Sequence, residues 1–285
     1  MAEIPQKITV KSAKEILSQP QLLFILKKTA LSKVEAIETW MLYKLGILGD
    51  DVCYGYIGNV GIKTFILPKL KLYIDTSYDI DVAVPSVSYF KNLEIKKERL
   101  IDEIIHKQYG FSYKYEIVYS PFEVYRILIP PFQIGHVECR EVDGFDKTTG
   151  VGPIPLSDED FKKRKKIEYL TSLPLETQLA AHINPKASNY ERENRAFFAS
   201  ISVDNIDYDA VQQKLEESTD VVRKAGIPLN PYKEGFRRIS RECEVIERKF
   251  EKKLTKEYKE YKDNIENWRK IIKLLNILYE ITPVV

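Results

Sequence analysis

Two aspartates stand two residues apart in the segment 78–85, which reads Tyr-Asp-Ile-Asp-Val-Ala-Val-Pro. Side chains alternate between the faces of a strand, so Asp79 and Asp81 share one face and the aliphatic residues share the other. Carboxylates this close repel each other and raise each other's pKa. A divalent cation removes the repulsion, because Mg²⁺ binds one or two carboxylates together with substrate phosphates. The alternative interpretation is a chance pair on a hydrated strand face.

The strand-like segment 133–142 offers a third carboxylate. Its polar and apolar residues alternate, which places Glu138 on the face away from the core. If this strand lies beside the aspartate pair, the three acids converge, and a functional site has more reason than a structural one to gather them. Glu141 and Asp143 are the alternative candidates.

Glycines precede the aspartate pair by one element. We expect a strand over residues 52–57, then a tight turn at Gly58 and Asn59, then a short helix or turn over 62–67. A glycine turn lets backbone N–H groups approach a phosphate closely. Because glycine marks most turns, the position before the aspartate strand is what gives this one weight.

The composition sets broad limits on the chain. It has 285 residues, 44% hydrophobic and 30% charged, with a net charge of +2, so we expect a globular protein without a global excess of positive charge. The dominance of Lys and Glu over two methionines is typical of thermophiles. The three separated cysteines argue against a zinc site and a disulfide framework. Neither a signal peptide nor a membrane span is predicted, which indicates a cytoplasmic protein.

The expected fold class is α+β, a mixed sheet flanked by helices with an all-helical C-terminal region. Capping boxes at 12–15 and 32–35 predict helix starts, and short strands are predicted over 112–119, 123–129 and 133–142. The loop 144–155 suggests a domain boundary. We therefore expect an α/β domain over 1–150 with N-terminal helices, and a helical domain over 151–285.

The C-terminal region carries two further patterns. Apolar residues recur every three or four positions from Phe236 to Tyr279, which predicts one long amphipathic helix or a hairpin broken near 252–256. Such a stripe is usually core, and the alternative is a surface for a partner helix. The basic run 162–166 is expected in the later turn of a helix capped at Ser157. It favours a solvated face, with contact to an RNA backbone as the alternative.

The order of these segments resembles the nucleotidyltransferase superfamily of the DNA polymerase beta type. That superfamily has a glycine turn, a strand with two acids separated by one apolar residue, and a third acid on a later strand. Within it, residues 50–205 are most similar to the AbiEii-like branch, known from abortive-infection toxins. The branch has a serine two residues before the first aspartate, matched by Ser77, and a helix of the kind P-x-E-x-x-L-A, matched by 174–180.

The chain also departs from that pattern. Asn59 stands where the family has Gly or Ser, and Asp75 and Thr76 stand where an arginine is expected before Ser77. The lysine expected in the later helix falls at His182. Lys186 lies one turn on, and the Arg-Asp pair expected in the next helix is echoed only by Arg192 and Arg195.

The resemblance implies transfer of a nucleoside monophosphate from an NTP to a hydroxyl or phosphate of an acceptor, with release of pyrophosphate. It assigns two Mg²⁺ (or Mn²⁺) ions and the catalysis to three carboxylates: Asp79, Asp81 and Glu138. It assigns the phosphates of the NTP to six residues: Gly58, Asn59, Ser77, His182, Lys186 and Arg192. The acceptor stays open among tRNA, another protein, the chain itself and a small molecule, and an antitoxin-like partner is implied by the branch.

Two rival interpretations remain. In the first, the chain is an inactive nucleotidyltransferase-fold protein that binds NTP or a protein partner through its helical C-terminal region. In the second, it is a helical interaction protein and the aspartate pair is incidental. The sequence leaves the oligomeric state open.

Overall fold

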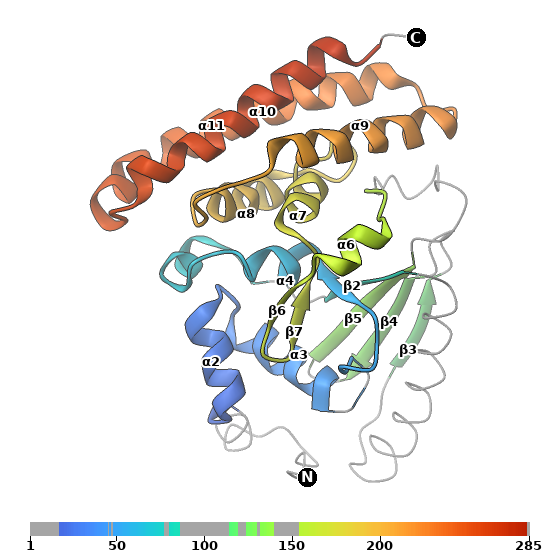
Figure 1. Ribbon diagram of the computed structural model, residues 1–285, viewed down its shortest axis with the longest axis vertical. Helices are drawn as coiled ribbons and strands as arrows, with labels where there is room; N and C mark the ends of the chain where they lie inside the picture. The colour runs from blue at the N-terminus through green and yellow to red at the C-terminus, as the bar shows by residue number, and fades with distance from the viewer. Residues whose placement is uncertain are drawn as a thin grey trace. The chain divides into compact units, whose positions relative to one another are not determined.

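The computed structural model is an α+β protein with a helical C-terminal region (Figure 1). It describes eight stretches: 17–44, 46, 48–76, 80–85, 114–118, 124–129, 132–139 and 154–283. For residues 41, 114–118, 124–129 and 132–139 only the backbone is described. The helix start expected at 12–15 lies outside these stretches.

Seven strands within the described stretches form one sheet in the order β3-β4-β5-β2-β1-β7-β6. Their bounds are β1 Gly55–Ile57, β2 Asp81–Val84, β3 Lys114–Val118, β4 Val124–Ile129, β5 Phe132–Cys139, β6 Lys165–Ile167 and β7 Leu170–Ser172. Strand β2 is antiparallel to β1 and parallel to β5, while β1 and β7 are parallel. The sheet is therefore mixed, as the sequence predicted.

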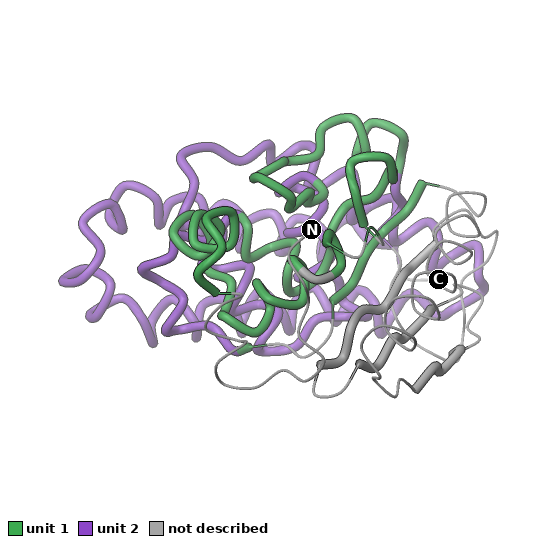
Figure 2. Tube along the Cα trace, turned by 90° about the horizontal axis from the view of Figure 1, so that it is seen from below, with its two compact units in different colours: residues 1–64, 76–142, 157–173 green, residues 65–75, 143–156, 174–285 purple. Residues whose placement is uncertain are grey.

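The chain divides into two compact units (Figure 2). The first contains residues 1–64, 76–142 and 157–173, and the second contains 65–75, 143–156 and 174–285. This division differs from the expected boundary near residue 150, because β6 and β7 return to the sheet after that loop. The helical segment before β2 likewise belongs to the second unit.

The first unit holds the sheet and four helices of its described part: α2 Pro20–Lys28, α3 Lys33–Lys44, α4 Gly58–Lys63 and α6 Asp158–Lys162. The capping box expected at the start of α3 is present. Glu35 Oε2 accepts from the Ser32 N–H at 2.7 Å, and Ser32 Oγ accepts from the Glu35 N–H at 3.2 Å. Two N–H groups at the helix start are thereby satisfied.

The basic run is placed differently from the prediction. Helix α6 ends at Lys162, and Lys165 to Ile167 form a strand that turns back on β7 through Glu168, whose φ is 52°. Lys165 lies inward and donates to the Thr64 carbonyl at 2.9 Å, which ties this hairpin to the segment after α4. Burial lowers the pKa of the Lys165 ammonium. A run of five basic residues with one lysine facing inward suits a sheet edge better than a solvated helix face.

The second unit is helical in its described part. Its bounds are the 3₁₀ segment η1 Pro68–Tyr73 and the helices α7 Leu175–His182, α8 Tyr190–Ser200, α9 Tyr208–Lys224, α10 Leu229–Glu257 and α11 Tyr261–Ile281. Helices α10 and α11 lie side by side along their length (Figure 1). The C-terminal pattern is thus a hairpin, broken at 258–260 and so slightly later than predicted.

The apolar stripe of this hairpin is buried. Phe236, Ile239 and Cys243 have no exposed surface, and Trp268 of α11 donates its indole N–H to the Cys243 carbonyl at 3.2 Å. The stripe therefore forms core within the described part of the second unit. No described helix combines the length and the apolar character needed to cross a membrane.

Candidate functional site

Asp81 opens strand β2 at the centre of the sheet. Its Cα pairs with Ile57 of β1 on one side and with His136 of β5 on the other. The Asp81 side chain is half-buried, whereas Ile80 and Val82 beside it are buried. The expected alternation thus holds here, with aliphatic residues in the core and the carboxylate on the opposite face.

Gly58 follows β1 directly and lies against the Asp81 carboxylate. Its φ is +67°, in the region that favours glycine, and a Cβ built on it would stand 2.4 Å from Asp81 Oδ2. Any other residue would collide with the carboxylate and strain the backbone. The predicted glycine turn therefore lies against the predicted acidic strand. Gly58 of this turn is the first residue of α4.

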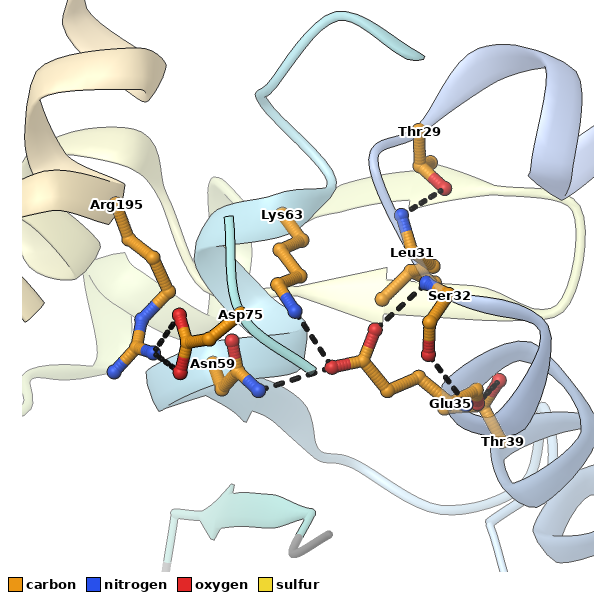
Figure 3. Close-up of polar contacts among 9 residues, drawn as sticks. All are labelled: Thr29, Leu31, Ser32, Glu35, Thr39, Asn59, Lys63, Asp75 and Arg195. Carbon is orange, nitrogen blue, oxygen red and sulfur yellow. Dashed lines mark hydrogen bonds and ion pairs between the residues drawn. The ribbon is translucent and has the colours of Figure 1, made fainter. Parts of the chain in front are cut away.

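Asn59 contributes its backbone to this turn, because its side chain points inward. The Asn59 side chain is 6% exposed, and its Nδ2 donates to Glu35 Oε1 at 3.0 Å (Figure 3). Its Oδ1 has no hydrogen-bond partner in the described part of the chain. The Asn59 side chain is therefore not a candidate for phosphate binding, because it binds Glu35 in the interior. Its backbone N–H stays a candidate.

Glu35 holds the turn at Gly58 and Asn59 in place through the Asn59 side chain. The sequence did not predict this role. The same Oε1 also accepts from Lys63 Nζ at 2.7 Å, and both side chains are almost fully buried (Figure 3). One carboxylate thus binds the first and last turns of α4 and the start of α3 together. The capping box identified Glu35, but nothing in the sequence indicated that it would also meet Lys63.

Four of the five candidate acids, and Ser77, are placed only in part or not at all. Asp79 and Ser77 lie outside the described residues. Position 138 lies in β5, where its Cα pairs with Ala83, two positions along β2 from Asp81. Since neighbouring strands keep their faces in register, positions 81, 83, 136 and 138 belong to one face of the sheet. The alternative acids at 141 and 143 also lie outside the described residues.

His182, on α7 of the second unit, is buried and does not supply a positive charge. Its Nδ1 lies 2.7 Å from the Gln178 carbonyl, to which it donates. Burial lowers the pKa of the imidazole well below its usual value, and the guanidinium groups of Arg195 and Arg192 lower it further. The ring is therefore neutral at pH 7, and its Nε2 has no hydrogen-bond partner among the described residues.

Arg195 joins two of the positions at which the chain departs from the family pattern. Its Nη1 binds both carboxylate oxygens of Asp75, at 3.0 and 2.9 Å (Figure 3). Arg195 is 7% exposed, and burial lowers the pKa of the guanidinium while Asp75 opposes this shift. Asp75 stands where the family pattern has an arginine, and Arg195 lacks the aspartate expected beside it. The two residues thus pair with each other.

The other two basic candidates are less enclosed. Lys186 and Arg192 are partly exposed, and their backbone N–H groups cap local turns through Asn184 and Asn189. Both side chains are accessible, so either can meet an anion from solvent. The structure does not relate these second-unit residues to the carboxylates of the first unit.

No group of three or more His, Cys, Asp or Glu side chains capable of holding a metal occurs among the described side chains. Asp81 alone of the three expected ligands has a described side chain. Its setting fits a cation, because the carboxylate is half-buried and faces a glycine whose missing Cβ keeps the approach open.

Comparisons with protein-family models, with curated proteins and with solved structures found no match to this chain.

Proposed function

We propose that the protein transfers a nucleoside monophosphate from an NTP to a hydroxyl or phosphate of an acceptor and releases pyrophosphate. The observation that carries this proposal is the contact between the turn at Gly58 and the Asp81 carboxylate. A glycine turn at a helix start beside a carboxylate brings a candidate phosphate-binding element next to a candidate metal-binding one.

The sheet around this contact supports the same reaction. Strand β5 runs parallel to β2, so position 138 and position 81 share a face and lie on adjacent strands. With Asp79, these residues would hold Mg²⁺, or Mn²⁺, through carboxylate oxygens, the ligands such ions prefer. The bound ions supply neutralisation of the triphosphate and activation of the acceptor hydroxyl.

The protein's own groups bind and orient the triphosphate. The N–H groups at Gly58 and Asn59 are candidates for its β- and γ-phosphates, with Ser77 beside the first acid. Glu35 holds α4 so that this turn keeps its place. Lys186 and Arg192 are candidates for the charge that develops on the leaving pyrophosphate. The neutral His182 supplies no positive charge and can act only as a hydrogen-bonding group.

Transfer is tested with NTPs labelled at the α-phosphate, with Mg²⁺, and with total RNA, a protein extract or the chain alone as acceptor. We expect label on one acceptor with the wild type and none with Asp79→Asn or Asp81→Asn. The matched control is Asp204→Asn, which neutralises an exposed aspartate elsewhere and should leave transfer unchanged. Activity that survives in either site variant would reject the metal assignment.

A binding protein of the same fold is the second candidate. It is favoured by the Arg195–Asp75 pair, because Nη1 of that arginine already binds a protein carboxylate. Mg²⁺-dependent NTP binding without label transfer to any acceptor would support this candidate. An antitoxin-like partner belongs to either version, and co-purification with the product of a neighbouring gene would identify one.

A further inference from the structure

A polar cavity lies in the first unit, and Gly58 is not among its lining residues. Its volume is about 170 Å³, and it is formed by the segment before β1, the end of α6 and the β6–β7 hairpin. Its walls are lined by Gly49, Asp50, Val52, Tyr54, Lys162, Arg164, Lys166 and Thr171. The basic run singled out in the sequence therefore supplies much of one wall.

The charges around this cavity favour an anion. Three cations line it, Lys162, Arg164 and Lys166, against the single carboxylate of Asp50. Asp50 already binds Lys166, while Lys162 only approaches Glu159 of its own helix, at 3.9 Å. The lining thus keeps an excess of positive charge, which raises the local concentration of anions.

Arg164 is held in place by the backbone, which leaves part of its guanidinium for a ligand. Its Nε donates to the Phe161 carbonyl, and its Nη1 donates to the Tyr54 carbonyl at 2.6 Å. A guanidinium carries five N–H donors in a fixed plane. Two are used in these contacts, so three have no acceptor among the described residues, and a planar fork fixed in advance suits the oxygens of a phosphate.

The size and place of the cavity define the ligand further. At about 30 Å³ per water molecule, the volume holds several waters, which is enough for one phosphate group. Tyr54 in the cavity wall precedes Gly58 by four residues, which at roughly 3.3 Å per residue puts it about 13 Å along β1 from the Gly58 turn. A phosphate here is therefore separate from those of an NTP at that turn.

We propose that this cavity binds a backbone phosphate of a single-stranded polynucleotide, which would be the acceptor. The acceptor assignment rests on the proposed transfer reaction, whereas phosphate binding does not. At about 3.4 Å per nucleotide in a stacked strand, about four nucleotides cover this distance, so one polynucleotide is long enough to reach both the cavity and the Gly58 turn. A free phosphate or nucleotide is the other source of the same chemistry.

The test measures binding of a fluorescent 20-nucleotide single-stranded RNA to the full chain by anisotropy, over a range of salt, without Mg²⁺ or NTP. We expect Lys162→Gln/Lys166→Gln to weaken binding about 10-fold and to reduce the slope of log affinity against log salt by about 1.4, the value for two lost phosphate contacts. The control, Lys163→Gln/Lys224→Gln, removes the same charge from exposed lysines outside the cavity and should change affinity less than 2-fold.

Equal losses in both double variants, or no loss in either, would overturn the phosphate site. A second arm titrates inorganic phosphate and metal-free ATP by calorimetry. Binding of these that depends on Lys162 and Lys166, with no RNA binding, would overturn the acceptor assignment and leave a free anion as the ligand. RNA binding that depends on Lys162 and Lys166, without label transfer from any NTP, would reject the transfer reaction alone, so its failure is distinguishable from a failure of this site.

Discussion

Gly58 distinguishes the proposed site from an ordinary turn, because two separate constraints act on it. Its positive φ costs a residue with a side chain about 1–3 kcal/mol, and its missing Cβ leaves room for the Asp81 carboxylate. Gly226, after α9, has the same φ of 68° but is exposed. Substitutions at Gly58 and Gly226 therefore distinguish the effect of backbone strain from the effect of damage to the site.

We predict that Gly58→Ala and Gly226→Ala each lower the free energy of unfolding by about 1–3 kcal/mol, measured by urea denaturation. Only Gly58→Ala should also abolish Mg²⁺-dependent NTP binding, because its methyl group displaces the Asp81 carboxylate. NTP binding that persists in Gly58→Ala would show that this contact is unrelated to the ligand.

Because Glu35 and Lys63 form a buried ion pair, we predict that replacing the Glu35 carboxylate by an amide strongly lowers the free energy of unfolding. Glu35→Gln removes the carboxylate that lies 2.7 Å from the buried Lys63 ammonium, and breaking a buried pair of this kind costs about 3–5 kcal/mol. The control, Asp220→Asn, breaks an exposed pair with Arg223 on α9 and should scarcely move the urea midpoint. Equal midpoints for both variants would mean that Lys63 finds another partner or reaches solvent.

Between α8 and α10, a buried carboxyl links stability to pH. Glu193 has no exposed surface, accepts from the Ser188 hydroxyl, and lies 3.6 Å from Arg238. Burial, and then the neighbouring Glu242 carboxyl, raise its pKa from 4.5 to about 8. Between these values the folded protein holds a proton that the unfolded chain has released, so stability falls as pH rises.

We predict that the free energy of unfolding attributable to Glu193 declines from about pH 5 to pH 8. Glu193→Gln, which stays neutral, should remove this part of the decline in urea midpoints measured at pH 5, 6, 7 and 8. The matched change Glu216→Gln, at an exposed position on α9, should leave the slope as it is. Parallel pH profiles for wild type and Glu193→Gln would contradict the raised pKa.

Helix α10 approaches the loop before α8 so closely that one position must be glycine. A Cβ on Gly235 would stand 2.5 Å from the Pro185 Cβ, in a ring that cannot turn aside. Gly235→Ala should therefore destabilise the protein, although alanine favours a helix interior by about 1 kcal/mol. A higher melting temperature in this variant would show that the helix and loop move apart at little cost.

Local signals predicted much of the helical structure. The Ser32 capping box, the helix after Pro174 and the apolar stripe beyond Phe236 are fixed by neighbours within one or two turns, and each matches the structure in type. The β6–β7 hairpin was missed, since both strands are three residues long and β6 lies in the basic run, and they become strands only because β7 pairs with β1 and β6 pairs with β7. Long-range pairing of this kind leaves little trace in a short segment.

The site was predicted to a lesser degree for the same reason. Alternation around Ile80 placed Asp81 on the face away from the core, and a glycine turn before it was expected. The partners of Glu35 and Arg195 lie 28 and 120 residues away, so no spacing revealed them. Whether Asp79 joins Asp81 remains a prediction.

For the molecule as a whole, the buried stripe of α10 and α11 bears on the rival interpretations. A surface for a partner helix needs an exposed apolar face, and the residues expected to form it are core in the described part of the second unit. The hairpin still exposes Val245, Ile277 and Ile281, so a transferase, a binding protein of the same fold and a helical interaction protein stay as the alternatives.

Calorimetric titration of each of the four NTPs into the full chain, with and without Mg²⁺, tests the central claim most directly. We predict that one or more NTPs bind only with Mg²⁺, that Asp81→Asn abolishes this binding, and that Asp204→Asn preserves it. Binding that ignores both Mg²⁺ and Asp81, or the absence of binding by any NTP, would contradict a metal and triphosphate site at the Gly58 turn.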